Sequence, residues 1–444
     1  MIRILFLSAA LAAPPQDTVH LSVATAVDRA LASHPAVAAA RAGVDVAAAE
    51  VGQAKAAWLP SVSVDGSLNR FQKPMVVFPL HALDLRNPPM FDTELSQASI
   101  GAAYTLYDFG ARSSRVKAAE SQRAAATASL GASEQLLVAR TLGAYLRVLT
   151  TRGILAAEDQ RVAALGAEAK RARDRLAAGK AARVDTLRAA SELANAAADR
   201  VNSAANVEMA EHDLARLMGA PFATVHNASL GTMSLASASD AAAATTRDAM
   251  VAQADAANAD VQAAIRRADA AMASVGAAKA GRLPQFQATT ALIDRSNITG
   301  RWLSEWQVGV GLAWPIYTGG ARTSAINRAD ASANAAQEQL RLTRLATEQQ
   351  VDEARALYDA SRARLTALES AVAQATEVAR ITALARDVGD GTQTDYLIAE
   401  ASLFRARSSL VQARHAVIGA RVELARVLGE LSRAWIVTSL ESQP

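Results

Sequence analysis

Four short segments of the chain alternate large apolar side chains with small or polar ones. The alternation covers all of Trp306–Trp314, and Ala98–Leu106 has the same pattern. Similar segments precede them at 61–68 and 285–292. A period of two is typical of β-strands that turn their large side chains to one face. The sequence therefore predicts two β-hairpins, at about 60–107 and 284–316.

Long stretches without helix-breaking residues predict unusually long helices. Ala321–Val388 contains neither glycine nor proline, which permits a helix on the order of 100 Å long at the usual rise per residue. The equivalent stretch, Arg112–Ala178, lacks proline, but its glycines are expected to make it looser. Helical character resumes after Gly179 and Gly389, so each long arm and its return arm form a helical hairpin. Two further helices are expected before the strand regions, at Ser22–Ala57 and Thr246–Ala280.

These elements occur twice in the same order. Gly179, Asp185 and Leu187 return as Gly389, Asp395 and Leu397 at a constant shift in numbering. Such a large internal duplication indicates one assembly built from two similar halves rather than several unrelated domains. The expected organisation is a first repeat at 13–219, a linker at 220–244, a second repeat at 245–430 and a tail at 431–444.

The N-terminus is typical of a secretory signal. Met1–Ile2–Arg3 precede an apolar run, and Ala10–Leu11–Ala12 supply the small residues of a cleavage site before Ala13. We therefore expect a signal peptide at 1–12, with a frayed apolar end as the alternative. No later segment has the ~18 uninterrupted apolar residues of a membrane helix. An exported chain of this kind would enter a membrane only with strands.

Composition narrows the class of protein. Hydrophobic residues make up 51 % of the chain, but only 4 % is aromatic, and much of the rest is alanine, which suits closely packed helices. The 46 Lys and Arg against 43 Asp and Glu provide no basic stripe for nucleic acid. Cysteine is absent. We find no catalytic constellation, phosphate loop or metal-ligand spacing, so no enzyme activity, cofactor or metal is expected.

The strands favour a membrane protein made of several subunits. Four strands cannot close a barrel around a lumen, because the small barrels have eight, so subunits would have to share one. Aromatic residues lie at or near the strand ends, where a membrane girdle belongs: Trp302, Trp306, Trp314 and Tyr104. The alternatives are a half-buried hairpin in a soluble domain and an extended coiled coil.

The order of these features resembles the TolC family of outer-membrane exit ducts. The residues that carry the resemblance are Trp58–Leu59–Pro60, the strand-to-helix junctions at 107–110 and 317–320, and the hairpin tips at 175–187 and 388–397. The resemblance implies a mostly α-helical homotrimer. Its twelve-stranded outer-membrane β-barrel, with four strands per subunit, would continue into a long periplasmic α-helical barrel.

The resemblance also implies where the duct opens and where its partners bind. A periplasmic gate would fall at Asp395, Tyr396, Leu397 and Asp185. Docking of an adaptor at the hairpin tips would fall at Gly179, Arg183, Val388, Gly389 and Thr392. A second acidic ring of the family would fall at Ile398, and a tip arginine at Gly391, so this chain departs from the family pattern at both places. The alternative role of Asp395, and of Asp185, is to cap the return helix.

The resemblance implies one function, and the residue patterns leave a second one open. The first is a passive outer-membrane exit duct of a tripartite efflux pump or type I secretion system. Its partners would be a periplasmic adaptor (a membrane fusion protein), an inner-membrane pump or ABC transporter, and outer-membrane lipid, with no nucleic acid. The second is a non-transporting periplasmic coiled-coil scaffold. The long loop between the first two strands, Gln72–Glu94, would lie outside the cell under the first function.

Overall fold

The computed structural model describes residues 20–76, 86, 91–180, 182–235, 245–296 and 302–443. The expected signal peptide lies outside these residues, as do most of the predicted external loop, the segment 236–244 and residues 297–301. The chain divides into two compact units. Unit 1 combines 1–38, 131–258 and 346–444, and unit 2 combines 39–130 and 259–345. Each unit therefore contains segments of both predicted repeats.

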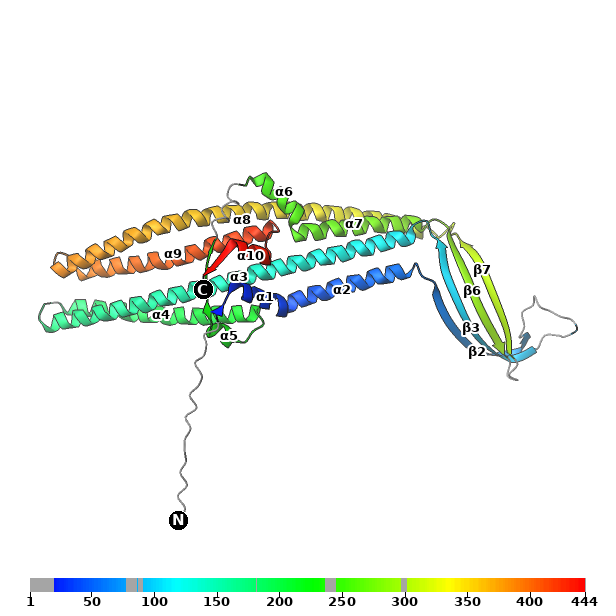
Figure 1. Cartoon of the computed structure of the whole chain (residues 1–444), viewed down its shortest axis with the longest axis horizontal. Coiled ribbons are helices and arrows are strands. Elements are labelled where there is room, and N and C mark those ends of the chain that lie inside the picture. The colour runs from blue at the N-terminus through cyan, green and yellow to red at the C-terminus, as the bar shows by residue number, and fades with distance from the viewer. Residues whose placement is uncertain are drawn as a thin grey trace, which may run out of the picture. The chain divides into compact units, whose positions relative to one another are not determined.

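Helices form most of the chain and appear in the same order twice (Figure 1). The first series is α1 (Val23–Ser33), α2 (Pro35–Ala56), β2 (Ser61–Val76), β3 (Phe91–Tyr107), α3 (Ala111–Ala177) and α4 (Arg183–Leu217). The second is α6 (Arg247–Ala257), α7 (Ala259–Ala280), β6 (Gln285–Ser296), β7 (Trp302–Ala313), α8 (Ala321–Val388) and α9 (Gln393–Val427). With 67 and 68 residues, α3 and α8 are each about 100 Å long.

The linker and the tail contain small elements of their own. Described linker residues form α5 (Phe222–His226), β4 (Ser229–Leu230) and β5 (Thr232–Leu235), and the tail forms α10 (Arg433–Ser439) and β8 (Leu440–Gln443). Strand β5 pairs with β8, and β4 pairs with β1 (His20–Leu21). The Tyr145 hydroxyl on α3 lies 2.8 Å from the Leu21 carbonyl oxygen and 3.0 Å from that of Gly231. Burial raises the pKa of this phenol to about 12, so it remains a donor at neutral pH.

The helices that precede the strand regions differ from expectation. Each predicted helix before a strand region is broken in two, because Pro35 starts α2 and Asn258 ends α6. The Asn258 side chain donates a hydrogen bond to the carbonyl oxygen of Val427, the last residue of α9, at 2.9 Å. The predicted long helix over 112–178 is present as α3, which its glycines do not interrupt. At Gly153 an added Cβ would approach Val411 of α9 to 3.3 Å, so this glycine permits close helix packing.

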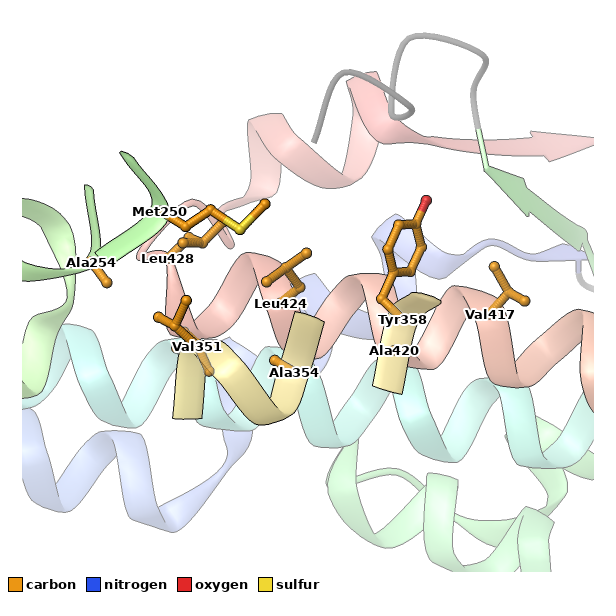
Figure 2. Packing of buried hydrophobic residues seen from close by; sticks show 10 residues of the cluster. Met250, Ala254, Val351, Ala354, Tyr358, Val417, Ala420, Leu424 and Leu428 are labelled. Atoms are coloured by element: carbon orange, nitrogen blue, oxygen red, sulfur yellow. The ribbon is translucent and has the colours of Figure 1, made fainter. Parts of the chain in front are cut away.

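A hydrophobic core of unit 1 joins α6, α8 and α9, as Figure 2 shows. The largest buried side chains in it are Met250, Tyr358 and Leu424. Alanines, among them Ala354 and Ala420, occupy the positions between them. Small side chains let the helices approach closely, while the few large ones supply most of the buried area.

The four predicted strands form one antiparallel sheet in the order β2-β3-β6-β7 (Figure 1). The register places the large apolar side chains in line across the sheet: Val64 lies opposite Ile100, Ile100 opposite Leu292, and Leu292 opposite Trp306. The opposite face carries the small and polar set, including the Arg295–Glu305 ion pair at 2.6 Å. Strands β2 and β7 are the two edges, and neither edge is paired with another described strand.

The junction from β3 to α3 shows how the sheet is attached to a helix. Phe109 and Gly110 adopt φ of 52° and 87°, which turns the chain sharply. The Asp108 carboxylate then accepts from the Arg112 backbone N–H at 2.9 Å and from its Nε at 3.1 Å. The Arg112 guanidinium lies over the Trp58 ring at 4.2 Å. In the second repeat Gly319 and Gly320 make the corresponding turn.

Candidate channel entrance and membrane surface

The tip between α8 and α9 is a tight turn made by two glycines. Gly389 has a φ of 93°, which favours glycine. The backbone N–H groups of Asp390 and Gly391 both donate to the Ala385 carbonyl, at 2.9 and 3.0 Å. A Cβ on Gly391 would come within 3.0 Å of the Arg386 backbone nitrogen. The turn itself therefore explains why glycine stands where the family pattern suggested an arginine.

Asp395 belongs to a capping box at the start of α9. The Thr392 hydroxyl accepts from the Asp395 N–H at 3.1 Å and donates to its carboxylate at 2.7 Å. Thr392 is therefore the N-cap, and Asp395 stands three residues inside the helix rather than at the cap position. The Asp395 side chain is exposed. Its predicted place in a constriction is compatible with this geometry but remains a prediction.

The tip between α3 and α4 is less firmly capped. Gly179 has a φ of 70°, and the Lys180 N–H donates to the Arg175 carbonyl at 2.8 Å. Asp185 occupies the position equivalent to Asp395, and its carboxylate accepts from the Ala182 N–H at 3.3 Å. Alanine has no side chain to complete a capping box. Arg183, a predicted docking residue, is exposed at the first position of α4.

Tyr396 and Leu397 are less exposed to solvent than Asp395, which precedes them in the sequence. Tyr396 is only 8 % exposed, and the Arg386 guanidinium lies over its ring at 4.0 Å. Burial, together with the negative charge of Glu400, raises the pKa of the Tyr396 phenol. Leu397 is half-buried and lines a cavity between α9 and the α3–α4 hairpin. Within this chain, two of the four predicted gate residues therefore pack between helices.

Two polar contacts between the hairpins were not predicted from the sequence. Arg386 on α8 donates to Glu168 on α3 at 2.9 Å, with both side chains buried. Arg188 on α4 donates to the Thr394 hydroxyl on α9 at 3.1 Å. No local sequence motif predicts either contact, because each depends on how two helices that are far apart in sequence align with each other. Both lie close to the tips and join the first hairpin to the second.

Three of the four predicted girdle residues lie at or near an end of the sheet, whereas Trp306 lies inside β7, because this strand begins four residues before the predicted alternation. Trp302 opens β7, and Trp306 lies on the same face of that strand with 76 % of its surface exposed. Trp314 follows the other end of β7 and donates from its ring N–H to the Arg282 carbonyl at 3.2 Å. Tyr104 lies near the same end, opposite Ala288. At about 3.3 Å per residue, β7 spans roughly 40 Å, more than the ~25 Å apolar band of an outer-membrane barrel.

Among the described residues, no helix combines the length and the apolar character needed to cross a membrane.

A model of the outer membrane efflux protein family matches residues 26–220 and 250–430, most of the chain. The chain belongs to the outer membrane efflux protein family. Members of this family are channels rather than enzymes, lie in the outer membrane and extend into the periplasm. They form homotrimers and work with periplasmic adaptors and inner-membrane pumps. The predicted family, fold class and location are confirmed, and the scaffold alternative is not favoured.

Individual relatives cover this efflux protein to different extents. Protein CyaE of Bordetella pertussis is 31 % identical over 216 residues, 48 % of this chain but only 42 % of CyaE. Outer membrane protein TolC of Vibrio cholerae is 25 % identical over 437 residues, 96 % of this chain and 95 % of TolC. The crystal structure of VceC from Vibrio cholerae matches with a TM-score of 0.77 at 20 % identity, covering 92 % of this chain and 96 % of VceC. The likeness to VceC shows the fold.

Proposed function

We propose that this efflux protein is the exit duct of a tripartite efflux pump or a type I secretion system. Three copies conduct substrates passively from an inner-membrane transporter and its periplasmic adaptor to the cell exterior. The chain itself catalyses no reaction and needs no cofactor. Its two sequence repeats, 13–219 and 245–430, each contribute one strand hairpin and one helical hairpin to the duct. Membership of a family of outer-membrane efflux channels supports this function.

The observation that carries the proposal is the exposed apolar face of the sheet. This face includes Val64, Leu68, Trp306, Val308 and Val310, each of which is at least 70 % exposed. An apolar face of this size in contact with water would be strongly unfavourable. Lipid would cover this face, and β2 of one copy could pair with β7 of the next. The backbone N–H and C=O groups along both sheet edges would then form hydrogen bonds, which a strand inside a membrane requires.

We assign the periplasmic gate to the region of Asp395 and Asp185, with Tyr396 and Leu397 packed behind it. The exposure of Asp395 supports this assignment, because a carboxylate repeated by three-fold symmetry could form a ring in the lumen. Tyr396 has a structural role rather than a place in the lumen, because its side chain is buried. It fixes the start of α9, which carries Asp395, against Arg386.

We assign adaptor docking to the two hairpin tips, at Gly179 and Arg183 and at Val388, Gly389 and Thr392. Val388 is 66 % exposed although it is large and apolar. Gly179 and Gly389 both have open space where a Cβ would stand. An exposed apolar side chain next to the Gly389 turn, with a second uncrowded glycine turn at the other tip, suits the close approach of another protein's backbone. Trp302, Trp306, Trp314 and Tyr104 we assign to the membrane girdle.

The test replaces a side chain on the apolar face with a charge. Arginine at the middle of a barrel's lipid face costs about 2–4 kcal/mol, and the cost falls on all three copies. Val310→Arg is therefore expected to reduce the amount of trimer in the outer membrane severely. The matched control is Gln307→Arg on the same strand, whose side chain lies on the opposite face. Equal trimer yields from both variants would contradict the proposal.

A further inference from the structure

A cavity in unit 2 lies where the sheet joins the helices, at the starts of α3 and α8 and the end of α7 (Figure 1). Its volume is about 450 Å³. Gln285 and Trp314 line it from the ends of the strands, and Leu283, Pro284 and Pro315 add apolar wall. The volume is within the usual range for a small-molecule site.

The charges on the wall of this cavity set the sign of its ligand. The charged residues that line it are Asp108, Arg115 and Arg322. The Asp108 carboxylate is paired with Arg112 at 3.1 Å, and both side chains are at most 10 % exposed. Arg115 and Arg322 are exposed, and no ion pair in the described part of the chain engages either guanidinium. The balance is two uncompensated positive charges, which favour an anion.

The neighbouring carboxylates do not change this balance. The first acidic residues of α3 and α8 are Glu120 and Asp330, and neither lines the cavity. Glu120 pairs with Lys55 at 2.8 Å, and Asp330 pairs with Lys279 at 3.7 Å. Each of these acidic side chains thus has a lysine of its own, and the two arginines of the cavity keep their charge for a ligand.

The position of Arg322 depends on the absence of a side chain at Gly281. A Cβ on Gly281 would lie 2.8 Å from Nη1 of Arg322, so the guanidinium occupies the space that a side chain would fill. Gly281 directly follows the last residue of α7. The carbonyl groups at a helix C-terminus carry partial negative charge, which favours a cation there. Glycine and helix end together place the guanidinium at the cavity wall.

We propose that this cavity binds a phosphate group, which Arg115 and Arg322 hold. The planar fork of N–H donors in a guanidinium matches two oxygens of a phosphate. A phosphate monoester carries up to two negative charges at neutral pH, as many as the cavity leaves uncompensated. The phosphate belongs either to a phospholipid headgroup or to a soluble compound inside the duct. The lipid source rests on the proposed function, because the sheet must span the membrane for this junction to reach the headgroups.

The test measures binding to the full-length protein extracted in mild detergent, with inorganic phosphate and phosphatidylglycerol as separate probes. Equilibrium dialysis reports binding of inorganic phosphate, and native mass spectrometry reports binding of phosphatidylglycerol. Arg322→Gln is expected to weaken binding about tenfold, through loss of hydrogen bonds from a charged donor. The matched control is Arg328→Gln, which removes one exposed arginine of α8 outside the cavity and should leave the affinity unchanged.

A second variant moves the Arg322 guanidinium without changing any charge. Gly281 does not have a positive φ, so alanine fits its backbone. The added Cβ of Gly281→Ala would take the space of the Arg322 Nη1 atom. We expect this variant to bind the probe several-fold more weakly than the wild type.

The two probes distinguish the sources of the phosphate. Saturable binding of inorganic phosphate identifies a soluble compound, and saturable binding of phosphatidylglycerol alone identifies a lipid. The proposal is overturned if neither probe saturates, if Arg322→Gln and Arg328→Gln bind alike, or if Gly281→Ala binds as tightly as the wild type. A trimer in the outer membrane that binds neither probe would lack this site and keep its function as a duct.

Discussion

Arg386 and Glu168 form an ion pair 2.9 Å long between the two helical hairpins, and their side chains are only 6 % and 5 % exposed. Burial works against the charge of Arg386, but its hydrogen bond to Asp387 and the charge of Glu168 outweigh burial and raise the pKa of the guanidinium. The same guanidinium lies against Tyr396. One residue thus connects the first hairpin, the end of α8 and the start of α9.

Breaking this pair should loosen the hairpins. Among the described residues, Arg386→Gln leaves the buried Glu168 with the exposed Arg171 as its remaining ion-pair partner, so we expect a loss of about 2 kcal/mol of folding free energy. Thermal unfolding of the extracted protein measures it. Arg380→Gln on the same helix removes an exposed pair with Glu377 and should have no measurable effect. Equal melting temperatures for the two variants would show that the buried pair does not hold the hairpins together.

The charge of Asp395 can be separated from its capping role. Asp395→Asn keeps a side-chain oxygen for the Thr392 N–H but removes the negative charge. We expect a lower preference for cations, or a higher conductance, in planar bilayers. Asp390→Asn neutralises a neighbouring carboxylate in the turn and serves as the control. Unchanged currents in Asp395→Asn would exclude Asp395 from the constriction.

His415 makes the stability of unit 1 depend on pH. His415 Nδ1 lies 2.6 Å from the Thr150 hydroxyl, which is also 2.8 Å from the Leu146 carbonyl oxygen. Burial, with the charge of Arg414, lowers the pKa of His415 in the folded state. The unfolded chain therefore binds a proton first as the pH falls below about 6.5, and stability decreases with it.

We accordingly expect the melting temperature to fall by a few degrees between pH 7.5 and pH 5, and His415→Gln to reduce that fall. His212→Gln, at an exposed position, should leave the fall as in the wild type. A steeper decline in His415→Gln than in the wild type would contradict the stated role of burial.

Much of the fold could be predicted from local patterns. The alternation of large and small side chains at Ala98–Leu106 and Trp306–Trp314 predicted strands β3 and β7, because all side chains on one face of a strand share the same surroundings. The absence of glycine and proline between Ala321 and Val388 defined α8 from end to end. Local patterns do not show tertiary contacts: the glycines of α3 leave it one continuous helix, and Gly153 permits its close packing with α9.

The candidate site was less predictable. Sequence spacing located the tips, but it treated Tyr396 and Leu397 as one set with Asp395, whereas the helix turns Tyr396 toward Arg386. The Arg386–Glu168 pair could not be predicted, because 218 residues separate its partners. The same limit applies to the cavity lined by Glu192 and Glu400, whose helices meet only in the folded chain.

The central claim is that copies of this chain share one barrel. The most direct test is the native mass of the protein extracted in mild detergent from a purified outer-membrane fraction. We predict three copies, which together supply the strands that β2 and β7 need at their edges. A monomer or dimer recovered in soluble form from the periplasm would mean that the apolar face never meets lipid and would contradict the account.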